Sequence, residues 1–126
     1  MSGKVRFILD TNAVVSLLNG NLGLALQLEA AEYVGISVIT YLEFLAFEGL
    51  SALDRKSFER FTARVEVVPL DHSDDQLTAL TLDLRCNTRL KLPDAIIGAT
   101  AISRKAILIT NDSHFSNVPS LIVREC

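Results

Sequence analysis

The sequence predicts an α/β domain, namely a three-layer sandwich with a central, mostly parallel sheet of about five strands. Two observations predict it. Short apolar segments alternate with segments of helical periodicity along the whole chain, and strands separated by helices usually pair in parallel, with helices on both faces. The chain has 126 residues, of which 49% are hydrophobic, which is enough for one buried core. Since no linker or repeat interrupts the pattern, we expect residues 1–126 to form a single domain.

The expected elements follow one another in order along the chain. Apolar runs predict strands at residues 5–9, 35–39, 65–70, 106–109 and 121–123. Helical spacing of apolar residues predicts helices over residues 12–18 and 22–31, from Thr40 past Ala46, from Asp54 to Val65, from Ser73 past Leu84, and from Pro93 to Ala101. Proline suits the first turn of the last helix, because its missing N–H has no partner there.

Three helix starts carry capping signals. Thr40 with Glu43, and Ser73 with Gln76, have the spacing of a capping box, in which a hydroxyl and an acid or amide satisfy the free N–H groups of the first turn. Asp54 has the character of an N-cap. These signals set the expected helix boundaries.

Four acidic residues stand between apolar segments and turns or helix starts: Asp10, Glu43, Asp94 and Asp112. Each has a purely structural interpretation as a cap, a dipole partner or a turn residue. However, the carboxyl ends of parallel strands share one edge, where open α/β sheets bind ligands. We therefore expect the four carboxylates to converge. Converging carboxylates repel one another and favour a bound cation, and oxygen ligands select Mg²⁺ or Mn²⁺. Acids that serve only as caps would point in different directions.

The overall charge gives no general attraction for nucleic acid, because the net charge is −3 and the pI is about 5.3. Arg85 and Arg89, at positions i and i+4 of a predicted helix, are candidate phosphate contacts, and a solvated helix face is the alternative. His72 and His114 have no partner at metal-ligand spacing. We read them as a surface residue and a loop residue.

The compartment expected from the sequence is the cytoplasm. Cys86 and Cys126 are unpatterned and fit a reducing environment better than a disulfide framework. No signal peptide is visible, and no apolar run reaches the roughly 20 residues of a membrane helix.

Four motifs, in order along the chain, resemble those of the PIN domain. They are Ile8-Leu9-Asp10-Thr11-Asn12, Ile39-Thr40-Tyr41-Leu42-Glu43, Leu92-Pro93-Asp94-Ala95-Ile96-Ile97, and Ile109-Thr110-Asn111-Asp112 followed by His114-Phe115. Within the PIN family the chain resembles the VapC toxins of bacterial toxin–antitoxin pairs. The resemblance covers essentially the whole chain.

This resemblance implies a PIN-like fold and a metal-dependent ribonuclease that cuts RNA endonucleolytically with Mg²⁺, or with Mn²⁺. It also implies inhibition by a small antitoxin of the VapB type, and often a homodimer. The acidic metal site of the family corresponds to Asp10, Glu43, Asp94 and Asp112. Asn12 matches the motif and would orient Asp10, and a residue of the first helical turn without such a role is the alternative. Thr110 matches a polar position and would position a ligand or water.

Two other functions remain open from the sequence. A phosphatase of the haloacid-dehalogenase type also places an aspartate after its first strand, but it needs a second acid two residues later, and here that residue is Asn12. A catalytically inactive PIN-like module that binds RNA or protein is the other. The apolar segments 22–33 and 41–50 are candidates for an antitoxin groove, and ordinary core is the alternative for most of their residues.

Overall fold

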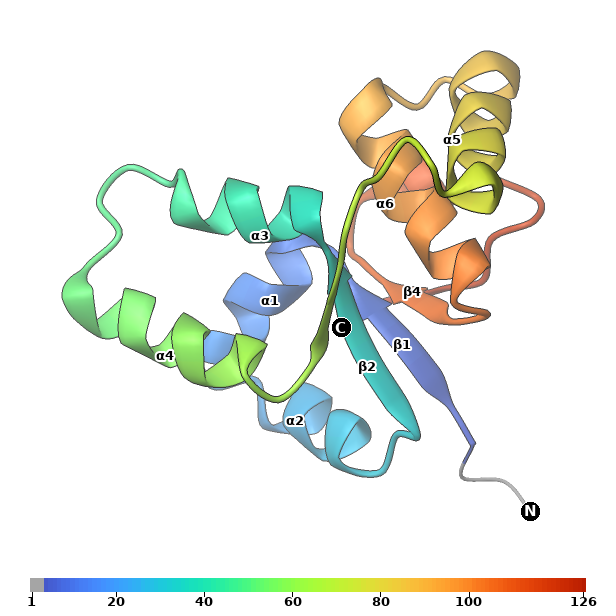
Figure 1. Ribbon diagram of the computed structural model, residues 1–126. Coiled ribbons are helices and arrows are strands. Elements are labelled where there is room, and N and C mark those ends of the chain that lie inside the picture. The colour runs from blue at the N-terminus through green and yellow to red at the C-terminus, as the bar shows by residue number, and fades with distance from the viewer. Residues whose placement is uncertain (1–3) are drawn as a thin grey trace.

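The computed structural model describes residues 4–126 and has a five-stranded sheet at its centre (Figure 1). The strands are β1 (Arg6–Leu9), β2 (Tyr33–Ser37), β3 (Glu66–Val68), β4 (Ile107–Ile109) and β5 (Val123–Arg124). They lie in the order β3-β2-β1-β4-β5, and every neighbouring pair is parallel. The predicted α/β class with a parallel sheet of about five strands is therefore confirmed.

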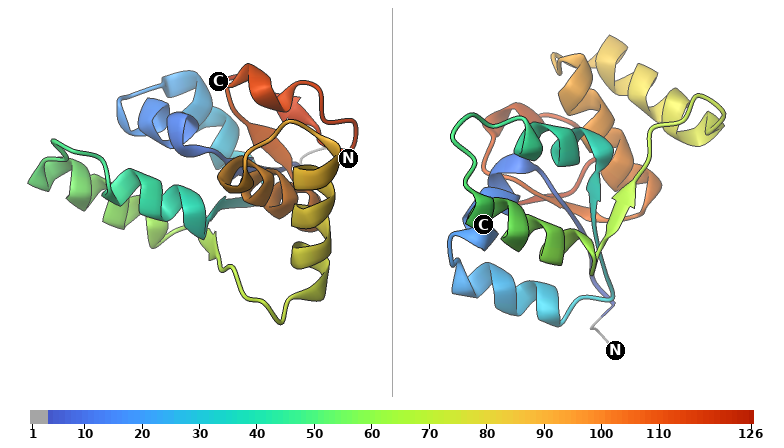
Figure 2. Two further views of the ribbon diagram at one scale, coloured as in Figure 1. Left: turned by 90° about the horizontal axis from the view of Figure 1, so that it is seen from above. Right: turned by 60° about the vertical axis from the view of Figure 1, so that its left-hand side comes forward.

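Helices cover both faces of the sheet. One face carries α1 (Thr11–Leu18), α2 (Leu22–Glu29), α3 (Val38–Leu45) and α4 (Ala52–Thr62). The other carries α5 (Asp75–Asn87), α6 (Leu92–Ser103) and the short 3₁₀ helix η1 (Ser113–Phe115). Figures 1 and 2 show these two groups on opposite sides of the sheet. No helix within residues 4–126 is long and apolar enough to cross a membrane.

The central strand β1 is buried on both faces, as its unbroken apolar run predicts. Phe7 and Leu9 pack with α1–α4, whereas Ile8 between them packs with α5 and α6. This alternation follows from the two-residue period of a strand. Seven consecutive residues of α6, from Ala95 to Ala101, are also buried. A rigid central strand and a closely packed helix therefore support the carboxyl edge of the sheet.

The boundary between β2 and α3 differs from the prediction. The strand ends at Ser37, which is the N-cap of α3, and its hydroxyl accepts a hydrogen bond from the Ile39 N–H at 3.0 Å. The predicted strand is present, but its predicted end at residue 39 and the predicted cap at Thr40 are wrong. Val38 and Ile39 prolong an apolar run that is typical of a strand, but they form the first turn of a helix. Thr40 lies buried inside that helix, so Glu43 does not belong to a capping box.

Two other helix starts are also shifted. Ser51 is the N-cap of α4 and forms a capping box with Asp54, which was predicted to be the cap. Asp74 is the N-cap of α5 and accepts from the Leu77 N–H at 3.0 Å, in place of the predicted Ser73. In each case two nearby residues are both good caps, and propensity alone does not decide between them.

A polar cluster ties the amino ends of the strands together. Arg104, just after α6, donates two hydrogen bonds to Glu66 at the start of β3, at 3.0 and 3.1 Å. The Tyr33 hydroxyl donates to the same carboxylate, and the Arg6 guanidinium lies 4.3 Å from the centre of the Tyr33 ring. Arg6 also donates to the main-chain carbonyl of Arg104 at 2.8 Å. Burial and the Glu66 carboxylate raise the pKa of Tyr33 to about 12. We call these four residues the amino-edge cluster.

Candidate active site

A pocket of about 300 Å³ lies at the carboxyl edge of the sheet. Its lining residues are Asp10, Thr11, Asn12, Glu43, Asp94, Ile97 and Asp112. All four acids selected from the sequence therefore line one pocket, although they come from four separate segments. The interpretation of these acids as unrelated caps predicts that they diverge, which the structure contradicts.

Asp10 follows β1 and is held by two fixed donors. It is the N-cap of α1, and its Oδ1 accepts from the Ala13 N–H at 2.8 Å. Its other oxygen accepts a hydrogen bond from the Thr110 hydroxyl. Burial raises the pKa of Asp10, the two hydrogen bonds partly offset this, and the charges of Asp112 and Asp94 raise the pKa further. Asp10 thus acts as a helix cap and still faces the pocket.

Thr110 connects two of the acids. It lies just after β4 and is almost completely buried. Its hydroxyl donates to Asp10 and accepts from the main-chain N–H of Asp112 at 2.9 Å. Asn12 lines the pocket but is exposed. Within the described part of the chain, Asp10 is oriented by Thr110 and the Ala13 N–H, and the predicted orienting role of Asn12 has no hydrogen bond to support it.

Glu43 lies on the outer side of the pocket. It projects from α3, is exposed, and its Oε1 accepts from the Thr11 hydroxyl at 2.5 Å. Because Ser37 caps α3, no capping role competes for the Glu43 carboxylate. The contact with Thr11 joins α3 to the first turn of α1 across one wall of the pocket.

Asp94 lies in the first turn of α6 and is half-buried. Burial raises the pKa of Asp94, and the charges of Asp112 and Glu43 raise it further, whereas those of His114 and Lys91 lower it. The neighbouring acids therefore repel Asp94, and nearby positive groups only partly offset this repulsion.

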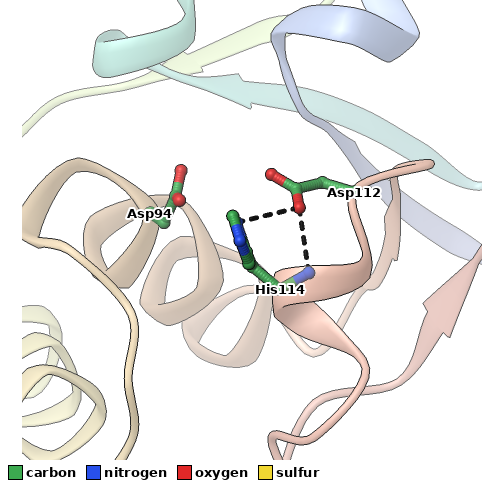
Figure 3. Close-up of side chains that lie close together, drawn as sticks. All are labelled: Asp94, Asp112 and His114. Atoms are coloured by element: carbon green, nitrogen blue, oxygen red, sulfur yellow. Dashed lines mark hydrogen bonds and ion pairs between the residues drawn. The ribbon is translucent and has the colours of Figure 1, made fainter.

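Asp112 and His114 form a compact group with Asp94 (Figure 3). Asp112 caps η1, and its Oδ1 accepts from the His114 N–H at 2.9 Å. The His114 Nδ1 lies 3.1 Å from the same oxygen. One possible ligand atom from each of the three side chains lies within 4.8 Å of the other two. The prediction of His114 as a loop residue missed this arrangement, although the Asp-x-His spacing was visible in the sequence.

The arginines chosen as phosphate contacts lie elsewhere. Arg85 is exposed on α5, but α5 ends at Asn87 and Thr88 is extended, so Arg89 is outside the helix. The predicted i, i+4 pair on one helical face is therefore wrong. Neither arginine lines the acidic pocket. Besides His114, the basic residue whose charge acts on Asp94 is Lys91, directly before α6.

The family model of the PIN domain matches residues 7–121. The chain belongs to the PIN domain family. This confirms the family inferred from the four motifs. No curated protein sequence matches this PIN domain.

Solved structures have the same fold as this PIN domain. A chain of VapBC2 from Rickettsia felis, bound to a promoter DNA fragment, has a TM-score of 0.81 and 21% identity, over 97% of this chain and 99% of that one. A chain of DNA-bound VapBC from Salmonella typhimurium has a TM-score of 0.78 and 22% identity, over 96% and 98%. A toxin–antitoxin complex from Klebsiella pneumoniae contains a chain with a TM-score of 0.73 and 26% identity, over 91% and 94%.

Proposed function

We propose that this PIN domain is the toxin of a type II toxin–antitoxin pair. In this proposal it is an endoribonuclease that hydrolyses RNA phosphodiester bonds with carboxylate-bound Mg²⁺ or Mn²⁺. The observation that carries the proposal is the convergence of Asp10, Glu43, Asp94 and Asp112 on one pocket. Membership of the PIN family and the similarity to toxin–antitoxin complexes support the toxin assignment.

The donor set fits a hard divalent cation. The pocket acids supply carboxylate oxygens, which Mg²⁺ and Mn²⁺ favour. Burial, and then repulsion by Asp112 and Glu43, raise the pKa of Asp94, and a dication among the carboxylates would relieve the repulsion. Asp94 and Asp112 would hold the ion, with Asp10 and Glu43 completing the acidic set. A bound divalent ion lowers the pKa of a coordinated water and stabilises negative charge on the scissile phosphate.

The protein's own hydrogen bonds preorganise these acids. Asp10 is fixed by the Ala13 N–H and by Thr110, so its carboxylate cannot rotate freely. Thr110 also holds the main chain at Asp112. A site whose ligands are already oriented loses less entropy when it binds an ion and a phosphate. Thr110 is therefore proposed as a positioning residue for the acids.

An acidic pocket needs positive charge nearby to hold RNA. Lys91 stands beside Asp94, while Arg85 and Arg89 are exposed on and just after α5. We keep both arginines as proposed phosphate contacts and add Lys91. Replacing a residue that contacts phosphate should weaken RNA binding and lower the salt slope of the affinity by about one. An unchanged slope in a variant would remove that residue from the proposed interface.

An antitoxin of the VapB type and a second copy of the chain are the proposed partners. A cavity of about 650 Å³ offers a place for an antitoxin segment between α2, β2 and α4. The predicted segment 22–33 contributes to it, but segment 41–50 does not, and residues 57–65 take its place. Its apolar lining includes Leu17, Ala25, Leu28, Val34 and Phe61. Sedimentation equilibrium tests the homodimer, which requires twice the 13.8 kDa of one chain.

The deciding experiment is cleavage of a labelled structured RNA with Mg²⁺, with Mn²⁺ and with EDTA. Wild type runs beside Asp10→Asn and Asp94→Asn, and circular dichroism checks folding. Asparagine caps helices about as well as aspartate, so Asp10→Asn should keep α1 intact. Asp74→Asn is a matched control, because Asp74 caps α5 and does not line the pocket.

We expect metal-dependent cleavage by wild type and Asp74→Asn, and its loss in both pocket variants. Cleavage by all four proteins alike would show that the activity comes from a contaminant. Metal binding without cleavage of any RNA would favour the inactive binding module. Capture of a phosphorylated aspartate would favour the phosphatase, a function that Asn12 makes chemically difficult because an amide cannot transfer the proton.

A further inference from the structure

We propose that His114 is a nitrogen ligand of the metal ion in the acidic pocket, so that the site prefers Mn²⁺ and Zn²⁺ to Mg²⁺ more strongly than a site of carboxylates alone. This inference rests on the proposed metal site. It adds to that site a side chain of different chemistry.

The position of the imidazole ring supports ligation. Figure 3 shows His114 reaching toward the space shared by Asp94 and Asp112. One possible ligand atom from each side chain lies within 4.8 Å of the other two, and the His114 Nδ1 is 3.1 Å from Asp112 Oδ1. Ligand atoms about 2.1 Å from an octahedral ion lie roughly 3.0 Å apart when adjacent and roughly 4.2 Å apart when opposite. The three side chains thus need only small adjustments to share one ion.

The local fold holds the histidine in place and leaves its ring adjustable. Asp112 caps η1 through the His114 N–H, which fixes the main chain of His114 beside the carboxylate. The next residue, Phe115, is buried in the core and anchors the turn. The His114 side chain is 76% exposed, so its ring can reorient toward an ion without disturbing the packing.

A simple ion pair between His114 and Asp112 explains less of this geometry. The Asp112 Oδ1 already accepts a hydrogen bond from the His114 main chain at 2.9 Å. The metal-free alternative that includes Asp94 is a positively charged imidazole attracted by both carboxylates, and the nitrogen coupling of bound Mn²⁺ distinguishes it from ligation. Participation of all three side chains is what a shared cation requires.

The consequence is a change in metal preference. Mg²⁺ takes oxygen ligands almost exclusively, whereas imidazole suits Zn²⁺ and other transition metals, whose affinity rises from Mn²⁺ along the first row. Removing the imidazole should therefore reduce the affinity for Mn²⁺ and Zn²⁺, and leave the affinity for Mg²⁺ nearly unchanged.

The chain offers a matched control in His72, the other histidine. It also lies beside an aspartate, with its Nδ1 3.5 Å from Asp71 Oδ1, but it is fully exposed and outside the pocket. His114→Gln and His72→Gln therefore remove the same type of side chain from the same type of pair.

The test measures metal binding to the purified chain, without RNA. Pulsed electron paramagnetic resonance of bound Mn²⁺ detects a directly coordinated imidazole nitrogen. Isothermal titration calorimetry gives the affinities for Mg²⁺, Mn²⁺ and Zn²⁺. We expect the nitrogen coupling in wild type and His72→Gln, and its loss in His114→Gln. We also expect the ratio of Zn²⁺ to Mg²⁺ affinity to fall by about tenfold or more in His114→Gln only.

Asp94→Asn separates failure of this inference from failure of the proposed function. If Asp94→Asn abolishes Mn²⁺ binding but wild type shows no nitrogen coupling, the metal site stands and His114 is not a ligand. If wild type binds no Mn²⁺, or Asp94→Asn binds it as well as wild type, the proposed metal site itself is wrong, and the inference falls with it.

Discussion

Replacing Thr110 with valine should destabilise the metal-free protein through the charge of Asp10. Valine has nearly the shape of threonine, so the change leaves the packing intact but removes the hydroxyl, which donates to Asp10 and accepts from the Asp112 N–H. Thr110 is 1% exposed and Asp10 is 5% exposed, so water has little access to replace the lost donor. A hydrogen bond to a charged group contributes roughly 1.5–3 kcal/mol. We therefore expect a loss of about 2 kcal/mol at pH 7.5, and a fall in melting temperature of roughly 6–10 °C.

The loss of stability caused by Thr110→Val should depend on pH in a defined direction. The pKa of Asp10 lies above its unfolded value of 3.8, and the Thr110 hydrogen bond lowers it, so the variant has a still higher folded-state pKa. The extra cost is fully present above the variant's folded pKa. It shrinks as the pH falls through that value toward the wild-type pKa, because Asp10 then becomes protonated in both proteins.

Urea unfolding in EDTA at pH 7.5 and near pH 4 measures this dependence. Thr100→Val is the control, because Thr100 is equally buried but its hydroxyl donates to the Ile96 carbonyl at 2.7 Å, within α6. Its cost should be about 1 kcal/mol and independent of pH. In an Asp10→Asn background, the cost of Thr110→Val should also fall to about 1 kcal/mol. A Thr110→Val cost that is the same at both pH values and in both backgrounds would refute the reasoning.

Three further substitutions have defined outcomes. Asp94→Asn should raise the melting temperature of the metal-free protein at pH 7.5, because it removes a charge that is partly buried and repelled by neighbouring carboxylates. The gain should vanish near pH 4, and a lower melting temperature at pH 7.5 would contradict this account. Gly35→Ala should lower the free energy of unfolding in urea by about 1–3 kcal/mol, since a Cβ there would lie 2.4 Å from the Tyr33 hydroxyl oxygen. An unfolding midpoint equal to that of wild type would show that the Tyr33 ring moves aside freely. Thr40→Val should raise the free energy of unfolding by about 1 kcal/mol, because the buried Thr40 hydroxyl has no hydrogen-bond partner among the described residues. A lower melting temperature in calorimetry would exclude this account.

The architecture and the grouping of the acids could be predicted because both follow from long-range rules. A run such as Phe7-Ile8-Leu9, with no polar face, fits only a strand buried on both sides. In a parallel sheet the residues that follow the strands collect at one edge, which brings Asp10 and Asp112 together whatever the loop details. Neither inference depends on the exact end of an element.

The boundaries and some of the contacts could not be predicted, because they depend on local competition. Ser37 and Thr40 are both good caps, and the helix begins at the earlier one, with Val38 and Ile39 in its first turn. The position of His114 beside Asp94 depends on the orientation that the three-residue helix η1 gives to the imidazole ring. Arg89 does not share a helical face with Arg85, because α5 ends two residues before Arg89. A single sequence does not fix choices of this size.

The amino-edge cluster gives α6 a second function besides covering the sheet. The first turn of this helix places Asp94 in the acidic pocket. Just past its other end, Arg104 donates to Glu66 and its main-chain carbonyl accepts from Arg6. Twelve helical residues span about 18 Å. The helix is therefore held at its carboxyl end by Arg104, and this contact opposes the movement that repulsion among the carboxylates would cause at its amino end. We therefore expect loss of the Arg104–Glu66 contact at one end of α6 to alter the position of Asp94 at the other end, and with it the fit of an ion.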